Sequence, residues 1–268
     1  MRVSAAVTEE KSGVFRLDNF ELDAPRSDEV LVEISATGIC HTDLRARDGN
    51  FQMPYPAVER AGVVAAFGSA VEYLAVGDHV VISFPWCGEC ENCREDRRSY
   101  CRRGSELKSS GRRADRSITM RRNGASVYGS FFQQFSFATH ALTPARNAIR
   151  VQRDAPLEFL GPLGCGVQTG AGAVLNVMKP EAGKSFAVFG AGAVGLAGLM
   201  AAKLIPHLID LFFAGRFPTP PRRVLRLRRD QSGGNGGGQR LDGQAGAANA
   251  PMMPTMEEAM ARKSYIIA

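Results

Sequence analysis

CGECENCREDRRSYC, at residues 87–101, carries four cysteines in one short segment: Cys87, Cys90, Cys93 and Cys101. Four thiolates satisfy a tetrahedral zinc ion, and spacings this short allow a single loop to wrap around the ion. A site closed by four thiolates is structural, because it leaves no open position for a substrate. An iron–sulfur cluster and a cluster without metal are the alternatives, although the spacing differs from the usual ferredoxin patterns.

The composition is ordinary for a globular protein, with 268 residues of which 44% are hydrophobic and 22% charged. This length suits one large domain or two smaller ones. The N-terminal stretch MRVSAAVTEEKSG lacks the apolar core of a signal peptide, so we expect a cytoplasmic protein whose cysteines bind metal. The longest apolar stretch, 186–202, is nearly as long as a membrane span, but its glycine pattern favours the interpretation given below.

The net charge of +6 is concentrated in two basic segments, 94–122 and 216–240. Neither segment interleaves aromatic residues with its arginines in the way that supports base stacking. We therefore expect neither a nucleic-acid partner nor a membrane partner for the fold as a whole.

The order of elements can be predicted from the residue patterns. Residues 1–85 are predicted to be rich in β-strands, because β-branched runs at 30–35, 62–68 and 78–84 are bounded by Gly, Pro or Asp. Residues 86–125 predict a polar lobe, and short strands return at 127–151. A helix is expected around 167–178, followed over 185–204 by a strand, a tight turn and a helix. The apolar stretch 204–217 is compatible with a helix, and residues 218–268 predict a disordered Arg/Gly-rich tail with a short helix at 256–268.

Three glycines in FGAGAVG, at residues 189–195, have the spacing G-x-G-x-x-G: Gly190, Gly192 and Gly195. In a dinucleotide-binding turn these glycines allow a tight bend, close approach of the pyrophosphate and close packing of a helix on its strand. A plain glycine-rich helix-packing motif is the alternative. Asp210 stands at about the distance expected for the acidic residue that binds the ribose, but its surroundings look helical.

Two further stretches contain reactive side chains. GICHTDL, at 38–44, places Cys40, His41, Thr42 and Asp43 in succession, and LGPLGCGVQTGAG, at 160–172, places Cys165 among glycines. By itself the Cys–His pair has three interpretations: a metal ligand, a nucleophile pair, or a buried cysteine beside an exposed histidine. Cys165 by itself is compatible with a small buried hydrophobic residue.

Taken together, the motifs resemble the zinc-dependent medium-chain alcohol dehydrogenases, and most of all the aryl- or benzyl-alcohol dehydrogenase branch. GICHTDL, the four-cysteine segment, LGPLGCGVQTGAGAVLN and AVFGAGAVG follow the order of that family, from residue 1 to about 203. The resemblance implies a mixed α+β and α/β fold. A GroES-like β-barrel catalytic domain would span 1–155, with the zinc lobe at about 86–125, and a partial Rossmann NAD-binding domain would span 156–217.

The resemblance also implies residue roles. Cys40 and Cys165 would bind a catalytic zinc, and Thr42 would hydrogen-bond the alcohol. His41 would lie near the cofactor pyrophosphate and Thr169 near the nicotinamide. Gly190, Gly192 and Gly195 would form the turn that binds NAD. The four clustered cysteines would hold the structural zinc. The implied reaction transfers hydride from a primary, aromatic alcohol to NAD, giving an aldehyde, in a protein that forms homo-oligomers.

The sequence departs from the family pattern at PYPAVERAGVV, residues 54–64. Family members have Gly-His-Glu-Gly-Ala-Gly here, and the His is the third ligand of the catalytic zinc. The simplest alignment removes that His, matches Glu59 to the family's Glu beside the zinc, and puts Arg60 in place of a Gly. We therefore expect weak or absent catalytic zinc and strongly reduced turnover.

The second departure concerns the dinucleotide domain, because we find only one strand and one helix after Ser185. A lone strand–helix unit cannot cover both faces of its strand, so we expect poor NAD affinity and exposed apolar surface around 186–213. The alternative to an impaired enzyme is a truncated, inactive remnant that binds the structural zinc only.

Overall fold

The structure is a computed structural model. It describes residues 1–50, 61–134, 137–190 and 192–205, and three strands at 210–214, 224–227 and 265–267. The chain divides into two compact units, Met1–Gly166 and Val167–Ala268, and each is described by itself.

The centre of the first unit is a five-stranded antiparallel sheet with the order β8-β3-β4-β5-β9. Its strands are β3 (Glu29–Ala36), β4 (Ala61–Phe67), β5 (His79–Ile82), β8 (His140–Pro144) and β9 (Ala148–Arg150). The β-branched residues that predicted strands at 30–35, 62–68 and 78–84 supply its core. Val30, Val32, Val64, Val80 and Ile82 are all buried together there.

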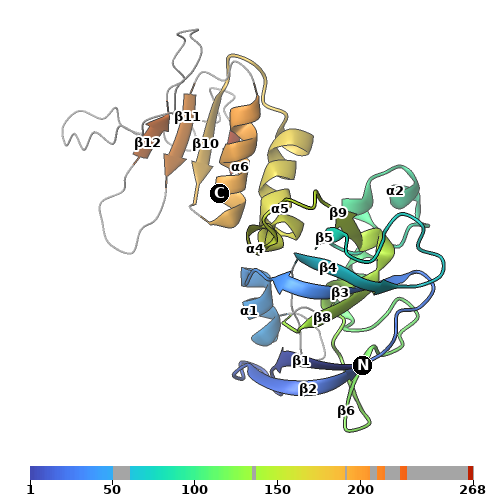
Figure 1. Cartoon of the computed structure of the whole chain (residues 1–268). Helices are drawn as coiled ribbons and strands as arrows, with labels where there is room; N and C mark the ends of the chain where they lie inside the picture. Colours follow the sequence, from blue (N-terminus) through green and yellow to red (C-terminus); the bar gives the residue numbers. More distant parts are fainter. Residues whose placement is uncertain are drawn as a thin grey trace. The chain divides into compact units, whose positions relative to one another are not determined.

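A second antiparallel sheet, of order β1-β2-β6-β7, lies against the first (Figure 1). Its strands are β1 (Arg2–Val7), β2 (Arg16–Leu22), β6 (Met120–Arg122) and β7 (Ala125–Val127). Leu31 and Leu142 from the first sheet pack with Val3, Phe20 and Met120 of the second in one apolar cluster. This shared core joins the two sheets and confirms the prediction of a β-rich first half.

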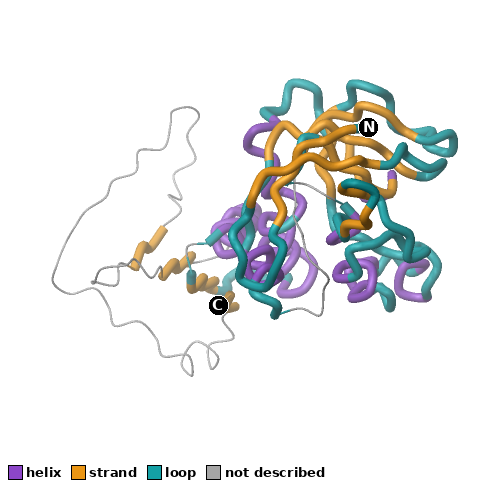
Figure 2. The backbone as a smooth tube through the Cα atoms, turned by 90° about the horizontal axis from the view of Figure 1, so that it is seen from below, coloured by secondary structure: helices purple, strands orange, loops and turns teal. Residues whose placement is uncertain are grey.

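Short helices and 3-10 turns fill the connections of the first unit, as Figure 2 shows for the tube of the chain. They are α1 (His41–Arg47), α2 (Glu91–Arg94), η1 (Arg98–Tyr100), α3 (Gly104–Ser109), η2 (Phe131–Gln133), η3 (Ala145–Asn147), α4 (Leu157–Leu160) and η4 (Gly161–Gly164). Three of them, α2, η1 and α3, make up the predicted polar lobe.

Helix α5 (Gly166–Gly172) starts at the last residue of the first unit, and all its other residues belong to the second, where it continues as the π-helical turn η5 (Ala173–Met178). Lys179 then adopts a left-handed conformation immediately before Pro180, so the helix ends where it was predicted to end. Strand β10 (Ser185–Phe189) and helix α6 (Ala193–Leu204) follow, separated by the glycine-rich turn. Phe186 and Val188 of β10 are fully buried against α6 and η5.

Strand β10 has neighbours on both sides. β11 (Asp210–Ala214) and β13 (Tyr265–Ile267) pair with it in parallel, and β12 (Val224–Leu227) pairs antiparallel with β11. The expectation of a lone strand–helix unit is therefore wrong. The helical interpretations of 204–217 and 256–268 are also wrong, because residues 210–214 and 265–267 within them form strands. Short apolar runs have no periodicity that separates a buried strand from a helix.

Exposed apolar surface does occur in the described part of 186–213. Phe189, Leu196, Met200 and Leu204 are each between 39% and 76% exposed, which confirms that expectation. None of the described helices is both long and apolar enough to cross a membrane. The apolar stretch 186–202 instead forms a strand, a turn and most of a short helix.

Candidate metal centres

The four clustered cysteines have the geometry of a closed metal site. The sulfur atoms of Cys87, Cys90, Cys93 and Cys101 all lie within 4.8 Å of one another. The Sγ atom of Cys93 is 3.8 Å from that of Cys87 and 3.5 Å from that of Cys90. A tetrahedral zinc with Zn–S bonds of about 2.3 Å requires sulfur atoms about 3.8 Å apart. The four side chains therefore fit one zinc ion.

The backbone of the lobe directs N–H groups at these sulfurs. The N–H of Cys90 donates to Cys87 Sγ at 3.4 Å, and the N–H of Cys87 donates to Cys101 Sγ at 3.3 Å. Backbone donors, that of Arg102 above all, lower the pKa of Cys90 to about 6. Burial raises the pKa of Cys93 to about 12, because it disfavours the charged thiolate. A bound cation would offset this cost of burying a thiolate.

Several arginines of the lobe form ion pairs with acidic residues that are close in sequence. Arg97 pairs with Glu95 and Arg102 with Glu91, each through exposed side chains. The net charge is unchanged by this pairing, but the acidic partners weaken the positive field close to these arginines.

A second pair of sulfurs forms far from the first in the sequence. Cys165 Sγ lies 3.6 Å from Cys40 Sγ, and the backbone N–H of Thr42 donates to Cys40 Sγ at 3.2 Å. Asp43 fixes the local backbone, because its Oδ2 accepts the N–H of Cys40 at 2.7 Å in a capping box at the start of α1. The hydrogen bond from Cys165, more than those from the hydroxyl and N–H of Thr42, lowers the pKa of Cys40 to about 5 against the opposing effect of burial.

Glycines allow the segment before Cys165 to lie against other backbone. A Cβ on Gly164 would stand 2.0 Å from the carbonyl oxygen of Ile82 at the end of β5. A Cβ on Gly161 would stand 3.2 Å from the backbone of Thr37, just before Cys40. A larger residue at 164 would therefore push this segment away from β5, and with it Cys165 away from Cys40.

The glycine-rich turn between β10 and α6 has a backbone geometry compatible with the three roles that its spacing predicted. Gly190 has a φ of +117°, which a side chain would strain. A Cβ on Gly195 would lie 2.2 Å from the carbonyl oxygen of Gly190, so helix and turn touch here. Gly192, at the N-cap of α6, has open space where a Cβ would point, as required for a phosphate to approach the backbone.

The comparisons with known proteins agree with these features. The profile of the family described as "Alcohol dehydrogenase GroES-like domain" matches residues 26–153. Geraniol dehydrogenase of Castellaniella defragrans is 43% identical over 205 residues, which are 75% of this chain and 55% of that protein. The crystal structure of benzyl alcohol dehydrogenase from Acinetobacter calcoaceticus is 42% identical, with a TM-score of 0.74 over 80% of this chain and 58% of that one.

The chain belongs to the zinc-containing medium-chain alcohol dehydrogenase family. An alcohol dehydrogenase zinc-binding domain protein from Burkholderia ambifaria gives a similar match, with 46% identity and a TM-score of 0.76 over 80% of this chain. The chain spans a little more than half the length of these relatives, between 55% and 58%. The expected GroES-like domain is therefore present, in a chain shorter than the dehydrogenases it resembles.

The structure brings together some of the site residues that the family resemblance predicts. Cys40, Cys165 and Thr42 are adjacent, whereas His41 is exposed on the first turn of α1. Glu59 lies outside the described residues, as does Arg60. In the part of the chain that the structure describes, the four-cysteine cluster is the only group of three or more potential ligands. No third ligand for Cys40 and Cys165 is found there.

Thr169 and Asp210 belong to the second unit. Thr169 is exposed on α5. Asp210 opens β11, next to Ser185 at the start of β10, so it stands at the amino end of its strand. An acidic residue that binds the ribose must stand at the carboxyl end, beside the glycine-rich turn. Asp210 is therefore not placed for that role.

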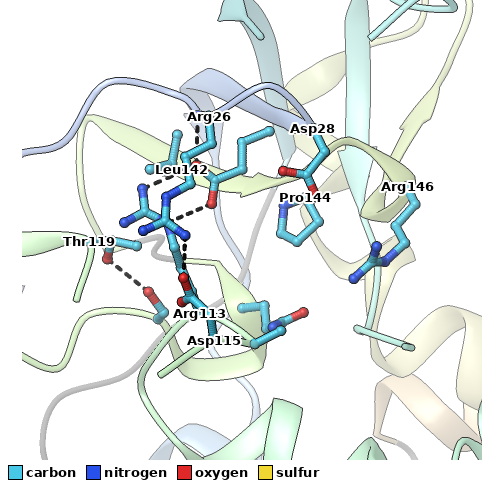
Figure 3. A pocket seen from close by; sticks show the side chains of 12 residues that line it. Arg26, Asp28, Arg113, Asp115, Thr119, Leu142, Pro144 and Arg146 are labelled. Atoms are coloured by element: carbon cyan, nitrogen blue, oxygen red, sulfur yellow. Dashed lines mark hydrogen bonds and ion pairs between the residues drawn. The ribbon is translucent and has the colours of Figure 1, made fainter. Parts of the chain in front are cut away.

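Sequence reasoning missed a polar pocket of about 180 Å³ in the first unit (Figure 3). Arg113 crosses it and donates to both carboxylate oxygens of Glu29, at 2.7 and 3.1 Å. Thr119 and Ser130, which also line the pocket, share a hydrogen bond of 2.8 Å. Because these groups satisfy one another, we interpret the pocket as a structural support of β3.

Proposed function

We propose that this chain is an alcohol dehydrogenase-type oxidoreductase that transfers hydride from a primary, aromatic alcohol to NAD with low turnover. The proposal is supported above all by the 3.6 Å contact between Cys40 and Cys165 beside Thr42. These two cysteines and this threonine are the residues that the family resemblance assigns to the catalytic zinc and to the alcohol. The benzyl alcohol dehydrogenase among its relatives supports an aromatic substrate.

Each residue has a defined task in this proposal. Cys40 and Cys165 would supply two thiolate ligands, and a zinc held there would act as a Lewis acid that lowers the pKa of an alcohol. The Thr42 hydroxyl would hydrogen-bond the alcohol and begin the relay that carries its proton away. Gly192 and the first turn of α6 would bind the cofactor phosphates, and Gly190 and Gly195 would keep that turn tight. The four clustered cysteines would hold the structural zinc.

Low turnover follows from the ligand count. Two thiolates leave a zinc short of the three protein ligands that catalytic sites use. Glu59 is the residue proposed to complete the set. If it does not, the chain is the inactive remnant that binds the structural zinc alone.

Zinc per chain in the purified protein tests the proposal, measured on wild type and on Cys165→Ser. We expect about two zinc ions in the wild type and about one in the variant. An assay with benzyl alcohol and NAD should then show slow turnover that the variant loses. About one zinc ion in both proteins, with no turnover, would replace the proposal by the remnant.

A further inference from the structure

The Cys40–Cys165 pair has a chemistry that needs no bound metal. Its sulfur atoms lie 3.6 Å apart, although the residues are 125 positions apart in sequence. Both side chains are half-buried, so a small oxidant can reach them in the folded chain. Two thiols held in contact by a fold are the arrangement from which a disulfide forms.

We propose that Cys40 and Cys165 form a peroxide-sensitive dithiol that closes to an intrachain disulfide. In the first step the Cys40 sulfur attacks hydrogen peroxide, giving a sulfenic acid at Cys40 and one water. In the second step the Cys165 thiol attacks that sulfur, giving the disulfide and a second water. The two thiols lose two electrons, and the peroxide O–O bond accepts them. A dithiol reductant returns both thiols.

The geometry favours this closure. A disulfide needs sulfur atoms about 2.05 Å apart, so the present separation must shrink by about 1.5 Å. Rotation of the two side chains contributes to this movement. Cys165 is the C-cap residue of η4, between Gly164 and Gly166, and its backbone is held by the hydrogen bond from its N–H to the carbonyl oxygen of Pro162 at 3.2 Å, so the side chains are the parts that move.

The other cysteines are expected to respond differently. Sulfurs of Cys90 and Cys93 are as close, at 3.5 Å, but they belong to a cluster with a complete set of four ligands for zinc. A zinc ion held by four thiolates lowers the reactivity of each of them toward an oxidant. The Cys40–Cys165 pair lacks a third ligand among the described residues, so any metal there is held by fewer bonds and protects less.

The inference rests on the geometry of the pair and not on the proposed alcohol oxidation. A disulfide would remove both thiolates from metal binding, so oxidation would also switch off the proposed site. If the chain proves to be an inactive remnant, the dithiol remains and is the more readily oxidised. The two proposals therefore fail separately.

Peptide mapping gives a direct test, because trypsin releases the two cysteines in separate peptides. Cleavage is expected to give 27–45, which contains only Cys40, and 154–184, which contains only Cys165, since Lys179 precedes a proline. The zinc-loaded chain is treated with hydrogen peroxide, blocked with iodoacetamide, digested without reductant and analysed by mass spectrometry. We expect the two peptides linked, at a mass about 2 Da below their sum. Dithiothreitol should release them.

Cys165→Ser is the matched control, and its folding is checked by zinc retention in the four-cysteine cluster. In this variant peptide 27–45 should carry a sulfenic acid that dimedone traps, and no link should form. The proposal is overturned if peroxide leaves 27–45 and 154–184 unlinked in the wild type. It is equally overturned if they link only after the chain is unfolded in urea. The wild-type result decides the matter even if the variant does not fold.

Discussion

Replacing Arg113 by Met tests whether a buried ion pair supports the strand that leads into the Cys40 site. Arg113 and Glu29 have side chains only 7% and 6% exposed. Arg113 makes two hydrogen bonds to Glu29, one to Asp23 at 2.9 Å and one to the carbonyl oxygen of Ile118 at 3.1 Å. The variant leaves the Glu29 carboxylate with the backbone N–H of Arg26 as its one remaining donor among the described contacts.

A buried charge that loses its partner costs about 3–5 kcal/mol. With a urea slope of about 2 kcal/mol per molar, the unfolding midpoint should fall by about 2 M. The assay is urea unfolding followed by fluorescence of Trp86, the one tryptophan of the chain, which lies in the same unit as Arg113. Arg97→Met is the control, since its pair with Glu95 is exposed and worth less than about 1 kcal/mol.

The double variant Arg113→Met/Glu29→Met separates loss of the pair from loss of packing. Replacing both charges by apolar groups should recover much of the stability, because no uncompensated charge then remains in the interior. A double variant less stable than Arg113→Met would refute the reasoning. So would a single variant that behaves like the Arg97→Met control.

Cys93→Ser should lose the structural zinc, and zinc content equal to wild type would contradict the four-thiolate site. Gly195→Ala should lower stability by about 1–3 kcal/mol, because its Cβ would lie 2.2 Å from the carbonyl oxygen of Gly190, and an unchanged thermal melt would show that the turn adapts. Hydrogen bonding by the backbone N–H of Ala75, chiefly, holds the pKa of Asp78 below its ordinary value of 3.8. The stability that the ionised Asp78 contributes is therefore present above about pH 4 and is lost as the pH falls through its lowered pKa in the folded state. In the Asp78→Asn variant, the urea midpoint should fall less steeply than in the wild type as the pH is lowered.

The parts of this molecule that the sequence predicts well are those whose partners are close in sequence. The zinc lobe is set by four cysteines between 87 and 101, so their spacing alone carries the chemistry. The turn at 189–195 is similar, because strand, glycines and helix are consecutive. Strands of the first sheet were visible as β-branched runs.

Contacts between distant residues were not visible in the same way. Nothing in the spacing joins Cys40 to Cys165, and only the family resemblance suggested it. The pairing of Arg113 with Glu29 spans 84 positions and has no local pattern. Strand β11 was missed because an apolar run of four residues fits a strand or a helix, and its parallel partner decides between them.

The contrast between ligands that are close in sequence and ligands that are distant in sequence has a consequence for function. The four-cysteine lobe collects its ligands from one short segment, so changes elsewhere in the chain need not disturb it. As a zinc site, the Cys40–Cys165 pair would depend on the capping box of α1, on the glycines before Cys165 and on the proposed third ligand Glu59. A change at any of these places would remove the proposed second centre and leave the four-cysteine lobe intact. A bound zinc is therefore evidence of the fold, and only a zinc lost on Cys165→Ser is evidence of a catalytic site.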